Sequence, residues 1–190
     1  MKYIKRFESV ITELNFSDRG LTNLPLLVLP ESLEILYCDR NKLNELPELP
    51  KNLYHLNCNK NVLVKLPELP IVLNYLDCDH NKLTELPELP DSLTDIYSSN
   101  NELVKLPKLP ESLKNLTCHR NKLKSLPKLP SSLEILMCSD NNLSELPLLP
   151  DTLEYLDCDG NNLPYKDLNG YNNWLKENHP EIVNSRKFNI

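Results

Sequence analysis

Six cysteines stand 20 residues apart along the chain, with a single gap, and such regular thiols invite a metal or disulfide interpretation. Zinc sites usually draw on cysteines that lie close in sequence, whereas each of these falls in a separate copy of a repeated phrase. Ser98 fills the gap, so a small side chain, not a shared ligand, is what these positions have in common. We predict free, buried thiols that act as small hydrophobic groups. The cysteines are Cys38, Cys58, Cys78, Cys118, Cys138 and Cys158.

Carboxylates form the other candidate ligand set. Asp77 and Asp79 flank one cysteine, and Asp157 and Asp159 flank another. Hard cations such as Ca²⁺ prefer clustered carboxylates, but a flat strand splays them and supplies no loop of backbone carbonyls. No nucleophile, base and orienting group can be placed together, and the sequence holds no glycine-rich phosphate loop. We therefore expect neither an enzyme nor a metal site, and no cofactor.

These residues sit inside a repeat. The phrase Leu-x-x-Leu-x-Cys-x-x-Asn-x-Leu first appears at Leu33 and occurs seven times at a spacing of 20 residues, with Ile96 and Ser98 as variations. Five copies continue with Leu-Pro-x-Leu-Pro and a sixth with Leu-Pro-Leu-Leu-Pro. A unit this short cannot bury its own apolar face, so it must stack on its neighbours. The period therefore predicts a solenoid, an architecture that mostly serves binding.

Each repeat is expected to form one short strand. Residues two apart share one face of a strand, so Leu36 and Cys38 would point inward and positions 35, 37 and 39 outward. Stacked copies then give a parallel sheet on the concave side. In Leu-Pro-x-Leu-Pro, proline restricts φ and pushes the preceding leucine toward an extended conformation. We predict extended, polyproline-like segments on the convex side.

The chain is predicted to be a single domain with a cap at each end. Residues 11–163 hold eight repeats, residues 1–10 would form an N-terminal cap, and residues 164–190 a C-terminal cap. Tyr171, Trp174 and Leu175 fall on one face of a short helix predicted at residues 171–178. Trp174 is predicted to cover the open end of the core.

The pattern resembles the leucine-rich repeat in its short, 20-residue form, which is known from effector proteins of Gram-negative pathogens and has similar counterparts in giant viruses. The resemblance covers residues 11–163 and implies the solenoid fold. It also implies that the asparagine column, from Asn41 to Asn161, bonds the backbone of each turn, as a buried amide requires. The valine column of the bacterial repeats is cysteine here, which is more similar to the giant-virus repeats. Some bacterial relatives carry a ubiquitin-ligase domain with a catalytic cysteine, but the 27 residues after Leu163 contain no cysteine, so that activity is not carried over.

The outward strand positions form the candidate binding surface. Positions equivalent to 34, 35, 37, 39 and 40 hold five of the eight tyrosines, twelve acidic and four basic residues, a net charge of −8 against −6 for the whole chain. Tyrosine is enriched in binding hot spots, and negative potential steers basic partners. The alternative is a solvated face with no ligand. The densest part, which we predict to be the binding site, comprises Tyr37, His55, Tyr75, Asp77, Asp79, Asp95, Tyr97 and His119.

Composition limits the partner and the compartment. A net charge of −6 argues against nucleic acid. No apolar run approaches the ~18 residues of a membrane span. The charged start of the chain has no apolar stretch behind it, so we expect no signal peptide. We predict a cytosolic protein, in the host cytoplasm if it is viral or an effector, that binds a protein partner with a basic patch.

A structural or self-assembling protein, such as a virion component, is the alternative. The column at position 48 changes its charge from acidic to basic halfway along the back. Such a column is usually a solvated face, but it would also allow two chains to associate. The sequence predicts a monomer or a weak oligomer. The column reads Glu48, Glu68, Glu88, Lys108, Lys128 and Leu148.

Overall fold

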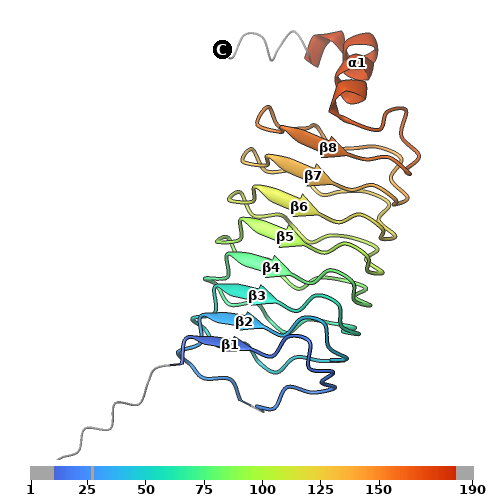
Figure 1. Cartoon of the computed structure of the whole chain (residues 1–190). Helices are drawn as coiled ribbons and strands as arrows, with labels where there is room; N and C mark the ends of the chain where they lie inside the picture. Colours follow the sequence, from blue (N-terminus) through green and yellow to red (C-terminus); the bar gives the residue numbers. More distant parts are fainter. Residues whose placement is uncertain (1–10, 27, 183–190) are drawn as a thin grey trace, which may run out of the picture.

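In the computed structural model, which describes residues 11–26 and 28–182, eight short parallel strands stack in sequence order. Figure 1 shows them as successive rungs of one sheet, with helix α1 beyond the last strand. This architecture confirms the predicted solenoid with its concave parallel sheet. The predicted N-terminal cap, residues 1–10, lies outside the described residues. The strands are β1 (Glu13–Asn15), β2 (Ile35–Tyr37), β3 (His55–Asn57), β4 (Tyr75–Asp77), β5 (Asp95–Tyr97), β6 (Asn115–Thr117), β7 (Ile135–Met137) and β8 (Tyr155–Asp157).

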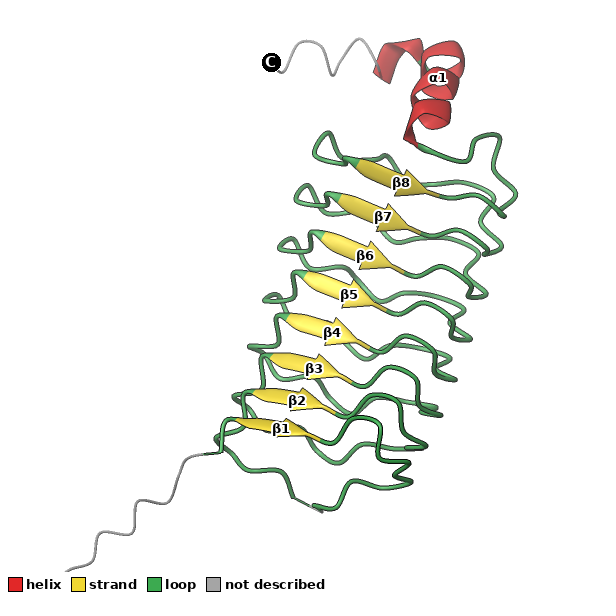
Figure 2. Ribbon diagram, viewed as in Figure 1, coloured by secondary structure: helices red, strands yellow, loops and turns green. Residues whose placement is uncertain are grey.

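The return path of each repeat is extended, as predicted. Figure 2 shows loops rather than helices on the side of the stack away from the strands. Residues 41–50, for example, contain neither strand nor helix. Pro47 and Pro50 explain this, because proline lacks the N–H group that a helix or a sheet ladder requires. Leu46 and Leu49, each directly before one of these prolines, pack against the core behind the sheet.

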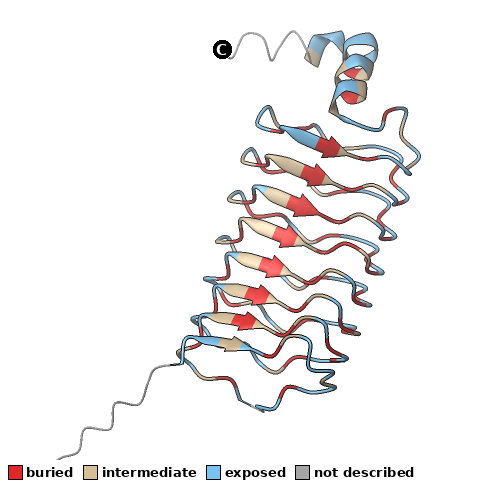
Figure 3. Cartoon of the chain, viewed as in Figure 1, coloured by how far each residue is buried: buried red, intermediate tan, exposed pale blue. Residues whose placement is uncertain are grey.

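The strand register is the predicted one. From β2 to β8 each strand buries its middle residue, which Figure 3 shows as one red stripe through the stack. In-register pairing places Leu36 beside Leu14 on one side and Leu56 on the other. Cys38 and its equivalents, one residue beyond the strands, are also buried. The leucine and cysteine columns therefore form a continuous core.

After each strand the chain turns through a residue with left-handed backbone conformation. In seven repeats this residue is not glycine, and its φ lies between 51° and 55°. In the last repeat it is Gly160, with φ of 65°. The left-handed conformation costs an ordinary residue about 1–2 kcal/mol, so other contacts must hold each turn. The seven residues are Asp18, Arg40, Lys60, His80, Asn100, Arg120 and Asp140.

An asparagine follows the left-handed residue in every repeat except the first, where Arg19 follows Asp18, and this asparagine supplies those contacts. The side-chain amide of Asn81 donates to the carbonyl oxygens of Cys58, Cys78 and Asp79 at 3.1, 3.1 and 3.2 Å. Its Oδ1 accepts a hydrogen bond from the backbone N–H of Leu63 at 3.0 Å. Each buried asparagine thus joins its own turn to the preceding repeat. The structural role predicted for this column is confirmed.

Helix α1, Leu168–Asn178, follows the last repeat. It begins three residues before the predicted start because Asp167 caps it, accepting a hydrogen bond from the Gly170 N–H at 2.7 Å. It ends at Asn178 as predicted, and the chain becomes helical again at Pro180. No helix among the described residues is long and apolar enough to cross a membrane.

The open end of the core is covered by tyrosine and leucine more than by tryptophan. Tyr165, Tyr171 and Leu175 are buried, whereas Trp174 is only partly buried. Trp174 packs on the outside of this cluster, with its ring centroid 5.3 Å from that of Tyr165. The prediction that Trp174 plugs the core was therefore wrong in detail, because the helix turns Tyr171 and Leu175 toward β8.

Candidate protein-binding surface

Four aromatic rings form a continuous ladder across the outward face of β2 to β5. The ring centroids of Tyr37 and His55 lie 5.2 Å apart, and those of His55 and Tyr75 lie 4.2 Å apart with nearly parallel planes. Tyr97 continues the row at 5.4 Å from Tyr75. Tyr37 and Tyr97 end their strands, while His55 and Tyr75 begin theirs, so the ladder shifts sideways between the two outward columns.

The ladder is half-buried. Burial lowers the pKa of His55, although the carboxylates of Asp77 and Glu13 oppose this effect. Burial, followed by the charge of Asp77, raises the pKa of Tyr75, and burial also raises that of Tyr97. All four side chains retain partial exposure. The arrangement is a strip of apolar ring surface that a second molecule can contact.

Two carboxylates lie beside the ladder at the end of β4. Asp77 accepts hydrogen bonds from the side-chain amide of Asn59 at 2.6 Å and from the backbone N–H of Asp79 at 3.1 Å. Asp79 accepts one from the backbone N–H of Ser99 at 2.5 Å. Burial raises the pKa of Asp77, and it raises the pKa of Asp79 to about 6. These are carboxylates that lack full solvation, so a cation placed against them would be stabilised.

Asp77 also has a structural role. Its bond to the N–H two residues on is repeated at the same position by Asn15, Asn57 and Asp157. Such a bond is an Asx turn, which fixes the direction of the chain as it leaves the strand. Only part of the hydrogen-bonding capacity of Asp77 is therefore free for a ligand.

Asp95 lies next to the ladder from the opposite side. It is the in-register neighbour of Tyr75 on the adjacent strand. Its two carboxylate oxygens accept hydrogen bonds from the Asn115 amide and the Thr94 hydroxyl, each at 2.5 Å. The structure thus brings seven of the eight predicted residues into one neighbourhood.

His119, the eighth, lies one repeat beyond the ladder. Its Nδ1 is 2.9 Å from the hydroxyl oxygen of Ser99, whose backbone N–H donates to Asp79. Burial lowers the pKa of His119. The ring lines a separate hollow of about 400 Å³, together with Arg120, Met137, Ser139, Asp140, Asp157 and Asp159.

The Ser99–His119 pair does not form a nucleophile for catalysis. Ser99 is fully buried, and its hydroxyl also lies 3.2 Å from that of Thr117. A substrate cannot reach such an oxygen. The pair instead belongs to a small polar cluster that includes Ser98, whose hydroxyl donates to the Thr117 carbonyl at 3.1 Å.

Three residues of this surface escaped the sequence analysis: Asn59, Ser99 and Asn115. Each stands in an outward column but is neither charged nor aromatic, so its residue type did not indicate a role in binding. Asn59 Oδ1 and Asn115 Oδ1 are buried acceptors without a hydrogen-bond partner among the described residues. The Ser98 break in the cysteine column was the available signal for Ser99.

The cysteine column is buried, with all six thiols free. Burial raises the pKa of Cys38 and of Cys118 to about 12, so these sulfurs stay protonated and unreactive at neutral pH. Among residues 11–26 and 28–182, no group of three or more histidine, cysteine or acidic side chains converges as a metal site would require.

Comparison with known proteins gives structural matches only, since no family model and no curated protein matches the chain. YopM, a leucine-rich effector protein from Yersinia pestis, is 40% identical with a TM-score of 0.77, over 81% of this chain and 44% of that one. The functional domain of InlJ from Listeria monocytogenes is 31% identical with a TM-score of 0.66, over 84% of this chain and 37% of that one. This chain therefore spans less than half the length of either.

The InlJ domain is described as including a cysteine ladder, so a cysteine column also occurs in bacterial repeats. A Shigella effector leucine-rich-repeat domain is 34% identical with a TM-score of 0.71, over 87% of this chain and 74% of that domain. This identity extends over most of both chains and agrees with the 20-residue period and the eight-stranded parallel stack. The chain belongs to the leucine-rich-repeat proteins of the short-repeat, bacterial effector type.

Proposed function

We propose that the chain is a non-enzymatic interaction module that binds a protein partner through its concave face. The aromatic ladder of Tyr37, His55, Tyr75 and Tyr97 carries the proposal. Rings held by contact with neighbouring rings lose little conformational freedom on binding, and tyrosines of this kind are enriched among the residues that dominate interface energies.

The carboxylates beside the ladder favour a partner with a basic patch. A lysine or arginine could lie on a tyrosine ring while its charge approaches Asp79 or Asp95. A partner that presents positive charge therefore fits the face best.

Effectors act inside host cells, and we propose this setting for the chain as well. Two of its similar structures are described as effectors, one from Yersinia pestis and one from Shigella. The six free thiols support a reducing compartment such as a cytosol. A bacterial or viral origin would be compatible with the same mode of binding.

The test is capture of partners from host-cell lysate on the immobilised chain, followed by direct measurement of each purified partner. The variant Tyr75→Ala/Asp77→Lys/Tyr97→Ala should lose the partner. We expect the dissociation constant to rise about 100-fold or more, which is the effect of removing two hot-spot residues. Because Asp77 also shapes its turn, Tyr75→Ala/Tyr97→Ala is measured beside it, with circular dichroism to confirm the fold.

A matched control changes two tyrosines and one acidic residue on the same face but outside the ladder. Tyr54 and Tyr155 are 41% and 50% exposed, and Glu154 is exposed too. Tyr54→Ala/Glu154→Lys/Tyr155→Ala should retain the partner. Equal binding by the ladder variants and the wild type would refute the concave site, and no partner at all would favour a structural, self-assembling protein.

A further inference from the structure

The convex wall carries a column of charges that is separate from the concave site. We define the back column as the residue between the two Leu-Pro pairs of six successive repeats. All six side chains are exposed, and no ion pair among the described residues involves the five charged ones. The column is Glu48, Glu68, Glu88, Lys108, Lys128 and Leu148.

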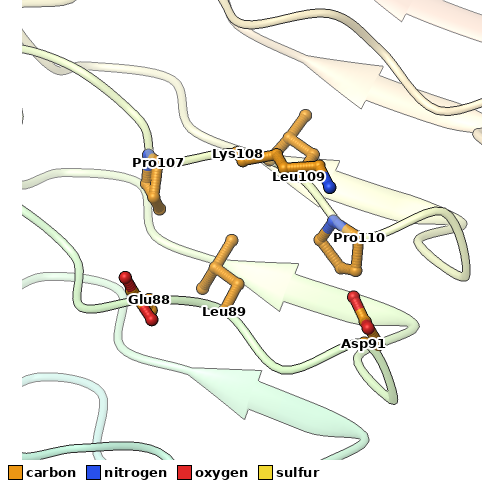
Figure 4. Close-up of a pocket in the computed structure, with 7 residues that line it drawn as sticks. All are labelled: Glu88, Leu89, Asp91, Pro107, Lys108, Leu109 and Pro110. Carbon is orange, nitrogen blue, oxygen red and sulfur yellow. The ribbon is translucent and has the colours of Figure 1, made fainter.

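Grooves open between successive repeats along this column. The central groove, of about 390 Å³, lies between the repeats that carry Glu88 and Lys108. Figure 4 shows Glu88 and Leu89 on one segment of the groove and Lys108 and Leu109 on the neighbouring one. The acidic and basic halves of the column therefore meet at this groove.

An apolar groove lies in the acidic half. It has a volume of about 890 Å³, and Leu49, Leu69, Ile71 and Val72 line it between Glu48 and Glu68. A smaller groove, of about 500 Å³, lies in the basic half. The residues that line this second groove include Lys128, Leu129 and Leu148.

Ile71 and Val72 interrupt a polar pattern. At the position equivalent to Val72, the other repeats carry serine, asparagine or threonine. That side chain donates a hydrogen bond to a backbone carbonyl of the preceding repeat, as Ser112 does to Asp91 at 2.7 Å. Val72 cannot donate such a bond. Ile71 is 83% exposed, and Leu148 is 57% exposed at the other end of the back column. The chain itself gains nothing from these exposed apolar groups, which favours an external contact.

We propose that the convex wall binds a second copy of this chain, back to back, with the repeat order reversed. The twofold axis would pass between the repeats of Glu88 and Lys108. Reversal then places Glu88 against the partner's Lys108 and Glu68 against the partner's Lys128. Twofold symmetry repeats both contacts, so the back column complements itself in four ion pairs.

The apolar residues meet complementary sites in the same arrangement. Leu148 faces the apolar groove of the partner near Glu48, and Ile71 faces the partner's smaller groove. One contact opposes association, because Asp91 approaches the partner's Glu111. Exposed ion pairs contribute little individually and weaken with salt, so the dimer is weak and salt-sensitive. This inference concerns a different surface and does not depend on the concave site.

Sedimentation velocity over a range of protein and salt concentrations tests the proposal. The wild type should show a monomer–dimer equilibrium that shifts toward monomer as salt rises. Glu68→Lys alone and Lys128→Glu alone should each raise the dimer dissociation constant about tenfold or more, because symmetry places each like-charge contact twice. An equimolar mixture of the two variants restores opposite charges at every contact and should form a heterodimer.

Glu154→Lys is the matched control, since it makes the same charge change on an exposed residue away from the back column. It should leave the dimer unchanged, and circular dichroism should show every variant folded. A wild type that remains monomeric up to its solubility limit would overturn the proposal. Variants that dimerise as the wild type does, or single variants whose mixture gives no heterodimer, would overturn it too.

Discussion

Replacing Asp79 with asparagine should stabilise this protein at neutral pH. The Asp79 carboxylate is partly buried beside Asp77, and burial raises its pKa to about 6 from an ordinary value of 3.8. Its hydrogen bond from the backbone N–H of Ser99 needs only an acceptor, which the Oδ1 of asparagine also provides. Asp79→Asn therefore keeps the bond and removes a poorly solvated charge.

The magnitude follows from linkage. The folded chain binds the Asp79 proton more tightly than the unfolded chain, so stability decreases as pH rises from about 4 to about 6 and then levels off. A shift of roughly two pKa units corresponds to about 3 kcal/mol. Because the side chain is only partly buried, we expect about 1–2 kcal/mol. Asp79→Asn should gain that amount above pH 6 and almost nothing near pH 4.

The assay is urea unfolding of both proteins between pH 4 and pH 8. Asp159→Asn is the control, since Asp159 occupies the same column in the last repeat, where hydrogen bonds from the Gly160 N–H and from Lys166 lower its pKa. That carboxylate stabilises the fold above its ordinary pKa, so its replacement should have the opposite sign. If Asp79→Asn were less stable than the wild type at pH 8, the Ser99 bond would outweigh burial, and the reasoning would be wrong.

Four further outcomes are expected. Asn101→Ala should lower the free energy of unfolding by about 2–4 kcal/mol in urea titration, because it leaves several buried backbone groups unpaired. Leu175→Ala should cost about 2–4 kcal/mol by the same measurement, since its side chain is 4% exposed in the C-terminal cluster. A thiol reagent should label the six cysteines slowly in the folded chain and rapidly in urea, as buried protonated thiols require. Binding of a basic partner, followed by titration calorimetry, should weaken as pH falls through about 6, where Asp79 becomes protonated.

The scaffold was predictable because the same short sequence pattern recurs every 20 residues and folds in the same way each time. Leu36, Cys38 and Asn41 recur with one spacing, and a regular strand and turn place each of them in only one way. The binding face was predictable only as a set of residues. Its members share no repeated spacing, and sequence alone did not show that the rings of Tyr37, His55 and Tyr75 lie against one another.

The C-terminal end shows the same limit. Residues 164–182 do not repeat, so the facing of the C-terminal helix depended on one aromatic spacing. That spacing located the helix, but it predicted that Trp174 covers the open end of the core. In the structure Tyr165, from the preceding loop, covers part of that end. A residue outside the helical pattern could not be identified from that pattern.

The sequence by itself determined the period, and with it the solenoid, the inward columns and the asparagine ladder, because stacking identical units leaves a single consistent register. Tertiary structure alone decided which outward side chains touch. Asn59 reaches Asp77 and Ser99 reaches Asp79 across neighbouring repeats, 18 and 20 residues apart in the chain. Contacts between non-repeated side chains depend on the twist between strands and on rotamers, and these also set the burial that shifts their pKa values.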